Sequence, residues 1–214
     1  MSKKVSKDEA LKAVKNISDK NSESSLQAEA MEAVKTLILW AGDNPEREGL
    51  LDTPKRVIKA YKQFFSGYND DPEEILSRTF EEVDGYDDAV IVRDIRLESH
   101  CEHHMVPIIG VAHVGYIPSS RVVGISKLAR LVDCYSKRLQ TQETMTAQIA
   151  NTIDKVLKPK GVAVVIDSNH NCMSTRGVHK THSSTITSRM LGIFRTDNKA
   201  REEFINLINS PQKF

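Results

Sequence analysis

The sequence has no large excess of charge of either sign. Its 214 residues include 30 Lys and Arg against 29 Asp and Glu, which leaves a formal net charge of +1. Because nucleic-acid-binding domains usually carry a basic surface, this balance does not indicate a nucleic-acid partner. No apolar run approaches the roughly 20 residues that a membrane-spanning helix needs, so we expect no membrane partner either.

Cysteine is scarce, and the number of cysteines is odd. Three cysteines in a chain of this length do not form the disulfide framework of a small secreted protein. The N-terminal segment MSKKVSKDEALKAVKN lacks the apolar stretch of a signal peptide, and its Asp8 and Glu9 are atypical of a transit peptide. We therefore expect a cytoplasmic protein whose thiols serve metal binding or catalysis.

The composition fits one domain, alone or with an arm. The hydrophobic fraction of 39% is sufficient for a buried core, and the sequence shows no internal repeat. Residues 1–24 are polar and predict an N-terminal tail. We interpret residues 25–214 as a single domain, with a helical arm over 25–85 and a sheet-containing part over 86–214.

Two amphipathic helices are predicted in the arm. Apolar residues over 26–41 follow the 3, 4, 7 spacing of a helix, and the Gly42–Pro45 segment ends it. A second helix begins with Thr53 as its N-cap and Pro54 at its first position, and it ends near Ser66.

The remaining part alternates strands and helices. Segments rich in β-branched residues predict strands over 90–98, 108–117, 162–166 and 184–194. Helical periodicity predicts helices that begin at Ser126, span 142–157 and span 197–208. The order β-β-α-α-β-β-α favours an α+β fold, with an antiparallel sheet and helices packed on one face.

The histidines are concentrated in two short segments. Six of the seven lie within residues 100–104 and 170–182, three in each, and each segment also contains a cysteine. Cys101 and His104 can hold one cation only if the strand has ended before His104, because positions three apart on a strand face opposite ways. His170 and Cys172 are two apart and would share one side of an extended chain.

Together the two segments could form a metal site. Cys101, His104 and Cys172 would give two thiolates and one imidazole with one open position for water, which is the pattern of a catalytic zinc. Water bound to such a zinc ionises near neutral pH, and His103 and His170 would remain as proton-transfer groups. Alternatively, the two cysteines could form a disulfide or be ordinary buried residues. The other histidines are interpreted as surface or hydrogen-bonded residues: His100, His113, His179 and His182.

Three further groups suggest a bound nucleotide. In GISKLARL, Ser126 is predicted at a helix N-cap, with Lys127 and Arg130 in the first turn, an arrangement suited to phosphate or equally to an ordinary solvated helix. Two other arginines could contribute to the same anion, namely Arg176 and Arg56. In RLQTQE, Gln142 and Glu143 could pair with the N–H edge of a purine or simply begin a helix.

Five motifs in the same order resemble the GTP cyclohydrolase I family. They are CEHH followed by MVP, then YIP, GISKLAR, RLQTQE and HNCMxxRG, and the likeness runs from about Thr53 to Phe204 with TPKR at its start. The resemblance implies zinc ligands at Cys101, His104 and Cys172 and catalytic histidines at His103 and His170. It implies that Glu143, with Gln142, holds guanine. It also implies triphosphate and ribose contacts at Ser126, Lys127, Arg130 and Arg176, and an arginine lent by a neighbouring subunit at Arg56.

The resemblance also implies a fold, an assembly and a reaction. The fold would be the tunnelling fold over residues 86–214, and the assembly a decamer of two face-to-face pentamers, with active sites at subunit junctions and the helical arm contributing. The reaction would be the zinc-dependent hydrolysis of GTP to 7,8-dihydroneopterin triphosphate and formate, the first step of tetrahydrofolate and pterin biosynthesis. Two alternatives are a silent relative such as dihydroneopterin triphosphate epimerase, which lacks the zinc set, and a zinc-stiffened binding module.

Overall fold

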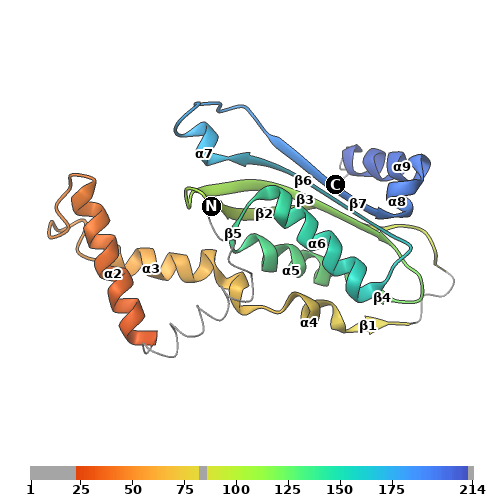
Figure 1. Cartoon of the computed structure of the whole chain (residues 1–214), viewed down its shortest axis with the longest axis horizontal. Helices are drawn as coiled ribbons and strands as arrows, with labels where there is room; N and C mark the ends of the chain where they lie inside the picture. The colour runs from red at the N-terminus through yellow and green to blue at the C-terminus, as the bar shows by residue number, and fades with distance from the viewer. Residues whose placement is uncertain (1–22, 82–85, 212–214) are drawn as a thin grey trace, which may run out of the picture. The chain divides into compact units, whose positions relative to one another are not determined.

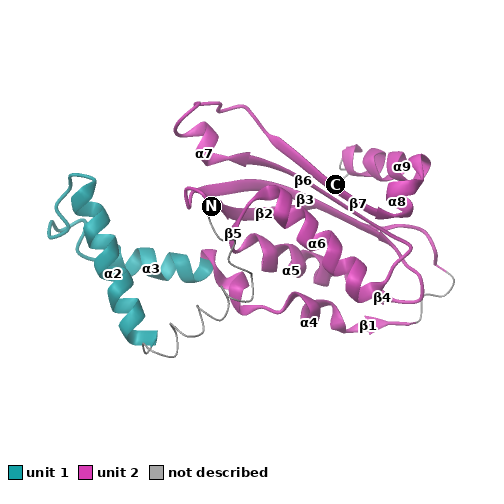
Figure 2. Ribbon diagram, in the orientation of Figure 1, with its two compact units in different colours: residues 1–63 teal, residues 64–214 magenta. Residues whose placement is uncertain are grey.

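The computed structural model describes residues 23–81 and 86–211. The predicted polar tail over residues 1–24 therefore lies outside the described residues, apart from its last two positions. The chain divides into two compact units, residues 1–63 and 64–214 (Figure 2). The assignment of an arm over 25–85 and a second part over 86–214 stays a prediction.

The first unit contains the two predicted helices. Helix α2 spans Glu23–Trp40, and α3 spans Thr53–Phe64, so that its last residue belongs to the second unit. Pro54, the second residue of α3, is buried. None of the α2 residues is buried within the part of the chain that the structure describes, and Trp40 is 86% exposed. Among the described residues, no helix is both long and apolar enough to cross a membrane.

The second unit contains one five-stranded sheet with helices around it (Figure 1). Its elements are η1 (Ser66–Asn69), α4 (Pro72–Ser77), β1 (Thr79–Phe80), β2 (Val90–Cys101), β3 (Pro107–Ile117), β4 (Val122–Val123), α5 (Ile125–Ser136), β5 (Leu139–Gln140), α6 (Gln142–Leu157), β6 (Gly161–His170), α7 (Asn171–Ser174), β7 (Thr185–Gly192), α8 (Ile193–Thr196) and α9 (Asn198–Asn209). This combination of helices with a five-stranded sheet confirms the predicted α+β class.

The sheet is antiparallel except at one edge. Its strand order is β5-β2-β3-β6-β7, and only β5, beside the end of β2, pairs in parallel. In the register, His100 lies opposite Pro107 and Ile108 opposite His170. The ends of β2 and β6 are therefore brought to the same end of the sheet, and both strands are longer than predicted.

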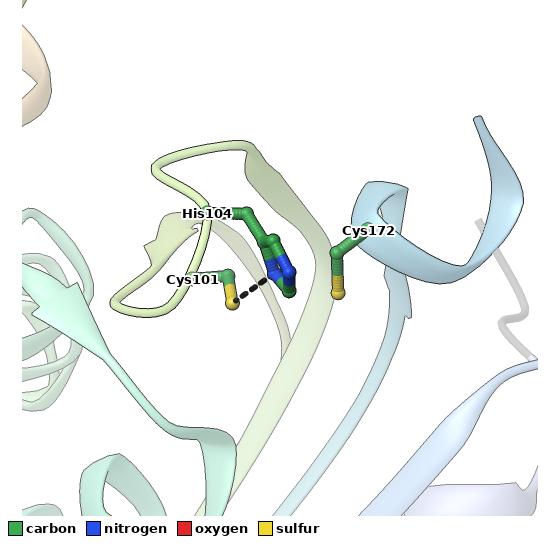
Figure 3. A group of neighbouring side chains, drawn as sticks. All are labelled: Cys101, His104 and Cys172. Carbon is green, nitrogen blue, oxygen red and sulfur yellow. Dashed lines mark hydrogen bonds between the residues drawn. The ribbon is translucent and has the colours of Figure 1, made fainter. Parts of the chain in front are cut away.

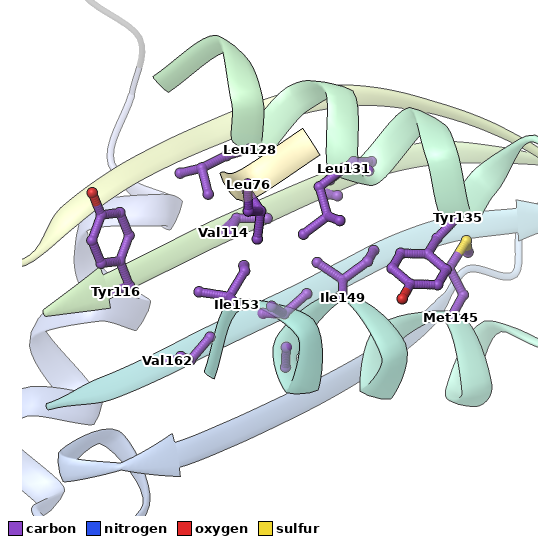
Figure 4. Close-up of a cluster of buried hydrophobic side chains, with 14 of the residues drawn as sticks. Leu76, Val114, Tyr116, Leu128, Leu131, Tyr135, Met145, Ile149, Ile153 and Val162 are labelled. Carbon is purple, nitrogen blue, oxygen red and sulfur yellow. The ribbon is translucent and has the colours of Figure 1, made fainter. Parts of the chain in front are cut away.

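The sheet buries apolar side chains on both faces. On one face, side chains of β6 such as Val164 and Ile166 pack with Leu131 of α5 and Ile149 of α6 (Figure 4). On the other face, the alternate residues Ala163 and Val165 pack with α8 and α9 through Phe194, Phe204 and Ile208. The prediction that the helices pack on one face is thus wrong for the helix predicted over 197–208, which is α9, and for the short α8, which was not predicted. The run VAVVI explains why helices lie on both faces, because a strand that is apolar at every position is covered on both sides.

Two local features differ from the prediction. The last strand ends at Gly192 rather than at residue 194, because the backbone turns there with φ +57°. Only glycine fits at this position, since a Cβ would lie 2.2 Å from the Lys160 carbonyl oxygen. Helix α4 was not predicted, although its sequence DPEEIL carries a start signal. Asp71 caps it by accepting hydrogen bonds from the Glu73 and Glu74 N–H groups.

His113, which is buried beside a bulge in β2, is a source of pH-dependent stability. The register shifts between Val92 and Ile95, where Asp94 adopts φ 58° and its N–H donates to His113 Nδ1 over 3.2 Å. Burial lowers the pKa of His113; Asp94 and Asp167 oppose this shift, and Arg93 adds to it. Because His113 is held neutral when folded, it stabilises the fold fully above its unfolded pKa of about 6.5, and this contribution falls as pH drops towards the lower folded pKa.

We expect His113→Asn, which keeps an acceptor near the Nδ1 position, to flatten this dependence. Urea midpoints measured between pH 7.5 and 5.5 should fall less in the variant than in the unsubstituted chain. His182→Asn, at an exposed histidine, should leave the slope unchanged. Equal slopes for His113→Asn and the unsubstituted chain would contradict the assignment.

Candidate metal centre and active site

The turn after β2 folds two histidines back towards Cys101. Strand β2 ends at Cys101, whose N–H donates to the Val106 carbonyl over 2.9 Å, while the Met105 N–H donates to the Cys101 carbonyl over 2.8 Å. Met105 closes this turn with φ 54°. The expectation that the strand ends before His104 is therefore confirmed, and the pair lies on a turn rather than on opposite faces of a strand.

Two thiols and one imidazole converge on one point. The possible ligand atoms of Cys101, His104 and Cys172 all lie within 4.8 Å of one another, and Cys101 Sγ is 3.8 Å from His104 Nδ1 (Figure 3). Cys101 is buried, His104 is exposed and Cys172 is partly exposed, and all cysteines of the described chain are free thiols. This group could bind a metal ion, and its sulfur and nitrogen donors suit zinc.

Cys172 reaches this group by a route that differs from the prediction. Strand β6 ends at His170, and the chain then turns into the short helix α7, so the two residues do not share the side of an extended strand. The hydroxyl of Thr175 donates to the Asn171 carbonyl within this turn. Burial and the neighbouring Cys101 thiol raise the pKa of Cys172, so metal binding would have to displace its proton.

The two candidate proton-transfer histidines flank the metal group differently. The His103 side chain is 66% exposed, and its Nδ1 lies 3.7 Å from Cys101 Sγ. His170 is half-buried, and its Nε2 lies 2.7 Å from Gln142 Oε1. Burial lowers the pKa of His170, while Glu143 opposes this shift. His170 is therefore the more firmly held of the two rings.

The start of α6 places one residue inside the protein and the next outside. The helix begins after Thr141, whose Oγ1 accepts from the Thr144 N–H over 3.3 Å. Gln142 is only 1% exposed, whereas Glu143 faces solvent near His170. The two neighbours predicted to hold a purine thus occupy different environments.

Arg176 also joins the metal group. Its Nη1 lies 2.8 Å from His104 Nε2. Because a guanidinium only donates, His104 Nε2 accepts in this contact, and the other ring nitrogen, Nδ1, lies 3.8 Å from Cys101 Sγ. His100, by contrast, packs against Phe64 and Phe65 and is not among the three grouped ligands.

The predicted phosphate residues other than Arg176 and Arg56 lie on α5. Helix α5 is capped by Gly124 without a side-chain hydrogen bond, so the prediction of Ser126 as N-cap is wrong. The cap lies two residues earlier because Val123, which precedes Gly124, is fixed by β4 and by its N–H bond to Tyr116 Oη over 3.1 Å. Ser126 and Arg130 are exposed and Lys127 is partly exposed.

The start of α5 is far from the metal group within one chain. Tyr116 lies near the end of β3. The turn that carries Cys101 and His104 comes just before Pro107, at the beginning of β3 (Figure 1). At about 3.3 Å per residue, this stretch of strand spans roughly 30 Å. The structure therefore does not bring Ser126, Lys127 and Arg130 to the metal group of the same chain. Arg56 lies in the first unit, where it pairs with Asp52 over 3.2 Å.

Comparison with known proteins decides the family. The family model for GTP cyclohydrolase I matches residues 30–209. The chain belongs to the GTP cyclohydrolase I family. Three relatives are named GTP cyclohydrolase 1. The one from Hyphomonas neptunium is 60% identical over 181 residues, covering 85% of this chain and 88% of the relative. The one from Maricaulis maris is 59% identical over 180 residues, covering 84% and 88%. The one from Brucella abortus is 58% identical over 184 residues, covering 86% of each.

Among solved structures, the match to the archaeosine synthase QueF-Like in the apo form covers 49% of this chain and 93% of the synthase chain. Its TM-score is 0.41 and its identity 20%, a likeness that carries no argument about the fold. The tunnelling fold of this GTP cyclohydrolase I family member stays a prediction.

The sequence analysis missed the residues that hold the candidate active-site side chains in place in this family member. Ser168 of β6 and Thr187 of β7 both bond the buried Gln142 amide. No spacing in the sequence signals this contact, because the three residues come from three separate elements. Only the pairing of β6 with β7 under α6 brings them together.

Proposed function

We propose that the chain is a zinc-dependent GTP cyclohydrolase that converts GTP and water to 7,8-dihydroneopterin triphosphate and formate, the first step of tetrahydrofolate and pterin biosynthesis. The observation that carries this proposal is the convergence of Cys101, His104 and Cys172 from two distant loops, with two further histidines beside them. When bound there, zinc would supply a water molecule that ionises near neutral pH. The same proposal gives a zinc ion, rather than another metal, as the cofactor.

His103 and His170 would transfer protons around the reacting purine. His170 would act near N7 of the guanine and the ribose oxygens, and the exposed His103 would serve intermediates beside the metal. Glu143 would accept hydrogen bonds from the N1–H and the 2-amino group of guanine. Adenine lacks this pair of donors, so ATP would cover the Glu143 carboxylate without pairing it, at a cost of about 1–3 kcal/mol for each acceptor left buried and unpaired, and ATP would be rejected.

The position of the phosphate residues supports a site shared between copies. Ser126 and Lys127 lie in the first turn of α5, at the end of the sheet away from the metal group of their own chain, and Arg130 lies in the next turn. One GTP would therefore take its triphosphate contacts from a neighbouring copy, with Arg176 beside the metal and Arg56 from a further subunit. Binding energy from the triphosphate would hold C8 of guanine at the metal.

The open sheet edges support the proposed assembly. Within the described residues, β7 pairs only with β6, and β2 pairs with β5 only at His100 and Cys101. Unpaired strand edges are templates for pairing with another chain, as a tunnelling-fold ring requires. We propose a decamer of two pentamers in which α2, with its exposed Leu37 and Trp40, contributes to assembly. We also propose that the protein acts in the cytoplasm.

The proposed reaction is tested by incubating the protein with GTP and no added magnesium. We expect release of formate and, after oxidation, a fluorescent pterin. A zinc-loaded protein that leaves GTP intact would instead be the non-enzymatic binding module.

A mixing experiment tests whether the site is shared. We expect Lys127→Ala/Arg130→Ala and Cys172→Ala to be inactive separately, because they damage opposite halves of one site. Co-expressed in equal amounts, they should recover about one quarter of the activity, since one junction in four then combines two intact halves in a symmetric ring. The control pair Cys172→Ala and His170→Ala damages the same half and should recover nothing. Absence of recovery in the first mixture would contradict a shared site.

A further inference from the structure

The Gln142 side chain lies at the centre of a buried hydrogen-bond network. Its Nε2 lies 3.0 Å from the Ile166 carbonyl, 2.8 Å from the Thr185 carbonyl and 3.1 Å from Thr187 Oγ1. Thr187 Oγ1 is held in turn by Thr146 Oγ1 at 2.7 Å. The network therefore ties the first residue of α6 to both β6 and β7.

These contacts fix which way the amide points. Backbone carbonyl oxygens only accept hydrogen bonds, so the atom that faces Ile166 and Thr185 must be the amide nitrogen. The amide oxygen consequently faces the other way. There it accepts from Ser168 Oγ over 2.6 Å and lies 2.7 Å from His170 Nε2.

The orientation of the amide determines the tautomer of His170. An amide oxygen cannot donate, so the hydrogen in this contact must lie on His170 Nε2. In the neutral ring, Nδ1 is then the nitrogen with the free lone pair, and the ring is held at a fixed angle by the same bond. A histidine whose one nitrogen is fixed in this way presents its other nitrogen to a reacting group in one defined state.

Gln142 has no hydrogen-bonding capacity left for a substrate. Its two N–H hydrogens face three protein acceptors, its oxygen has two protein partners, and the side chain is 1% exposed. We infer that Gln142 is a positioning residue, which sets the tautomer and angle of His170, and that its side chain does not contact guanine. This inference rests on the proposed function and refines the part that Gln142 plays in it.

The test separates positioning from substrate contact. We expect Gln142→Met to keep its zinc and to lower kcat for GTP about tenfold or more, which is the scale of a displaced proton-transfer group. KM should stay within about threefold, as should the Kd for GTP measured by equilibrium dialysis on metal-free protein, because a side chain that does not touch guanine contributes no binding energy. A rise of tenfold or more in Kd with kcat unchanged would overturn the inference.

A matched control lies two turns along the same helix. Gln148 is also a partly buried glutamine, whose Oε1 accepts from Gln140 Nε2 over 3.0 Å, and it does not contact His170. Gln148→Met should keep kcat near that of the unsubstituted enzyme. An equal loss of kcat in both variants would show a general effect of removing a glutamine from α6 and would overturn the inference.

A second comparison shows whether Gln142 acts through His170. In a His170→Ala background, Gln142→Met should cause almost no further loss, because the group that it positions is absent. Independent, multiplicative losses would overturn the inference. An unsubstituted enzyme that releases no formate would instead disprove the proposed function, so the two failures are distinguishable.

A measurement on the unsubstituted protein avoids the risk that Gln142→Met does not fold. With ¹⁵N-labelled histidine, the nitrogen resonances of His170, identified by their absence in His170→Ala, distinguish protonated from unprotonated ring nitrogens. We expect a hydrogen on Nε2. An unprotonated Nε2 would overturn the inference whatever the reaction proves to be.

Discussion

Replacing Cys172 with alanine is expected to remove zinc and activity together. The three candidate ligand atoms lie within 4.8 Å of one another, and loss of one thiolate leaves only Cys101 and His104, which do not hold zinc firmly. Formate release from GTP should fall by on the order of 10³-fold or more, because water in the site would no longer ionise near pH 7. Metal content by atomic emission and formate release on the same sample give the two values.

Cys134 provides the matched control for this change. It is a buried thiol, which lies against the Gly67 carbonyl and the Arg138 guanidinium rather than near the metal group. Cys134→Ala should therefore keep both zinc and formate release. If Cys172→Ala retained both as well, the ligand assignment would be wrong.

The second large effect is expected at His170, with the opposite pattern for the metal. His170→Ala leaves all three candidate ligands in place, so zinc should be retained. Loss of a proton-transfer group typically lowers the rate by about 10²–10⁴-fold, and we expect the formation of the fluorescent pterin to fall within this range. Zinc content and pterin formation should be measured together.

His182, an exposed histidine of the loop that follows α7, gives the comparison. His182→Ala should keep both zinc and pterin formation. Loss of zinc from His170→Ala would show that this histidine holds the metal rather than moving protons, and full activity would remove it from the reaction.

Local signals in the sequence were sufficient for several elements. The helix over 142–157 was predicted from periodicity with the same bounds as α6, and in the structure Thr141 caps its start and Lys158, with φ 47°, ends it. The metal group was also predicted from spacing, since a Cys-x-x-His turn and a His-x-Cys segment each follow a strand. The helix bounds and the two half-sites depend on residues close to one another in the chain, whereas the meeting of Cys101 and His104 with Cys172 depends on the pairing of β3 with both β2 and β6.

Features that depend on distant contacts were missed or wrong. The all-apolar run VAVVI indicates that both faces of β6 are covered, but periodicity could not show which helix covers which face. The cap of α5 depends on β4 and Tyr116 rather than on Ser126. The burial of Gln142 follows from the pairing of β6 with β7, and the distance between α5 and the turn that carries Cys101 and His104 follows from the length of β3.

The central claim is that a metal held by Cys101, His104 and Cys172 makes the hydrolysis of GTP possible. The most direct test is to remove the metal from the unsubstituted protein with a chelator and then add zinc back in steps. We predict that metal-free protein releases no formate, and that release rises in proportion to bound zinc until each chain holds one ion. Undiminished formate release from the metal-free protein would contradict the account.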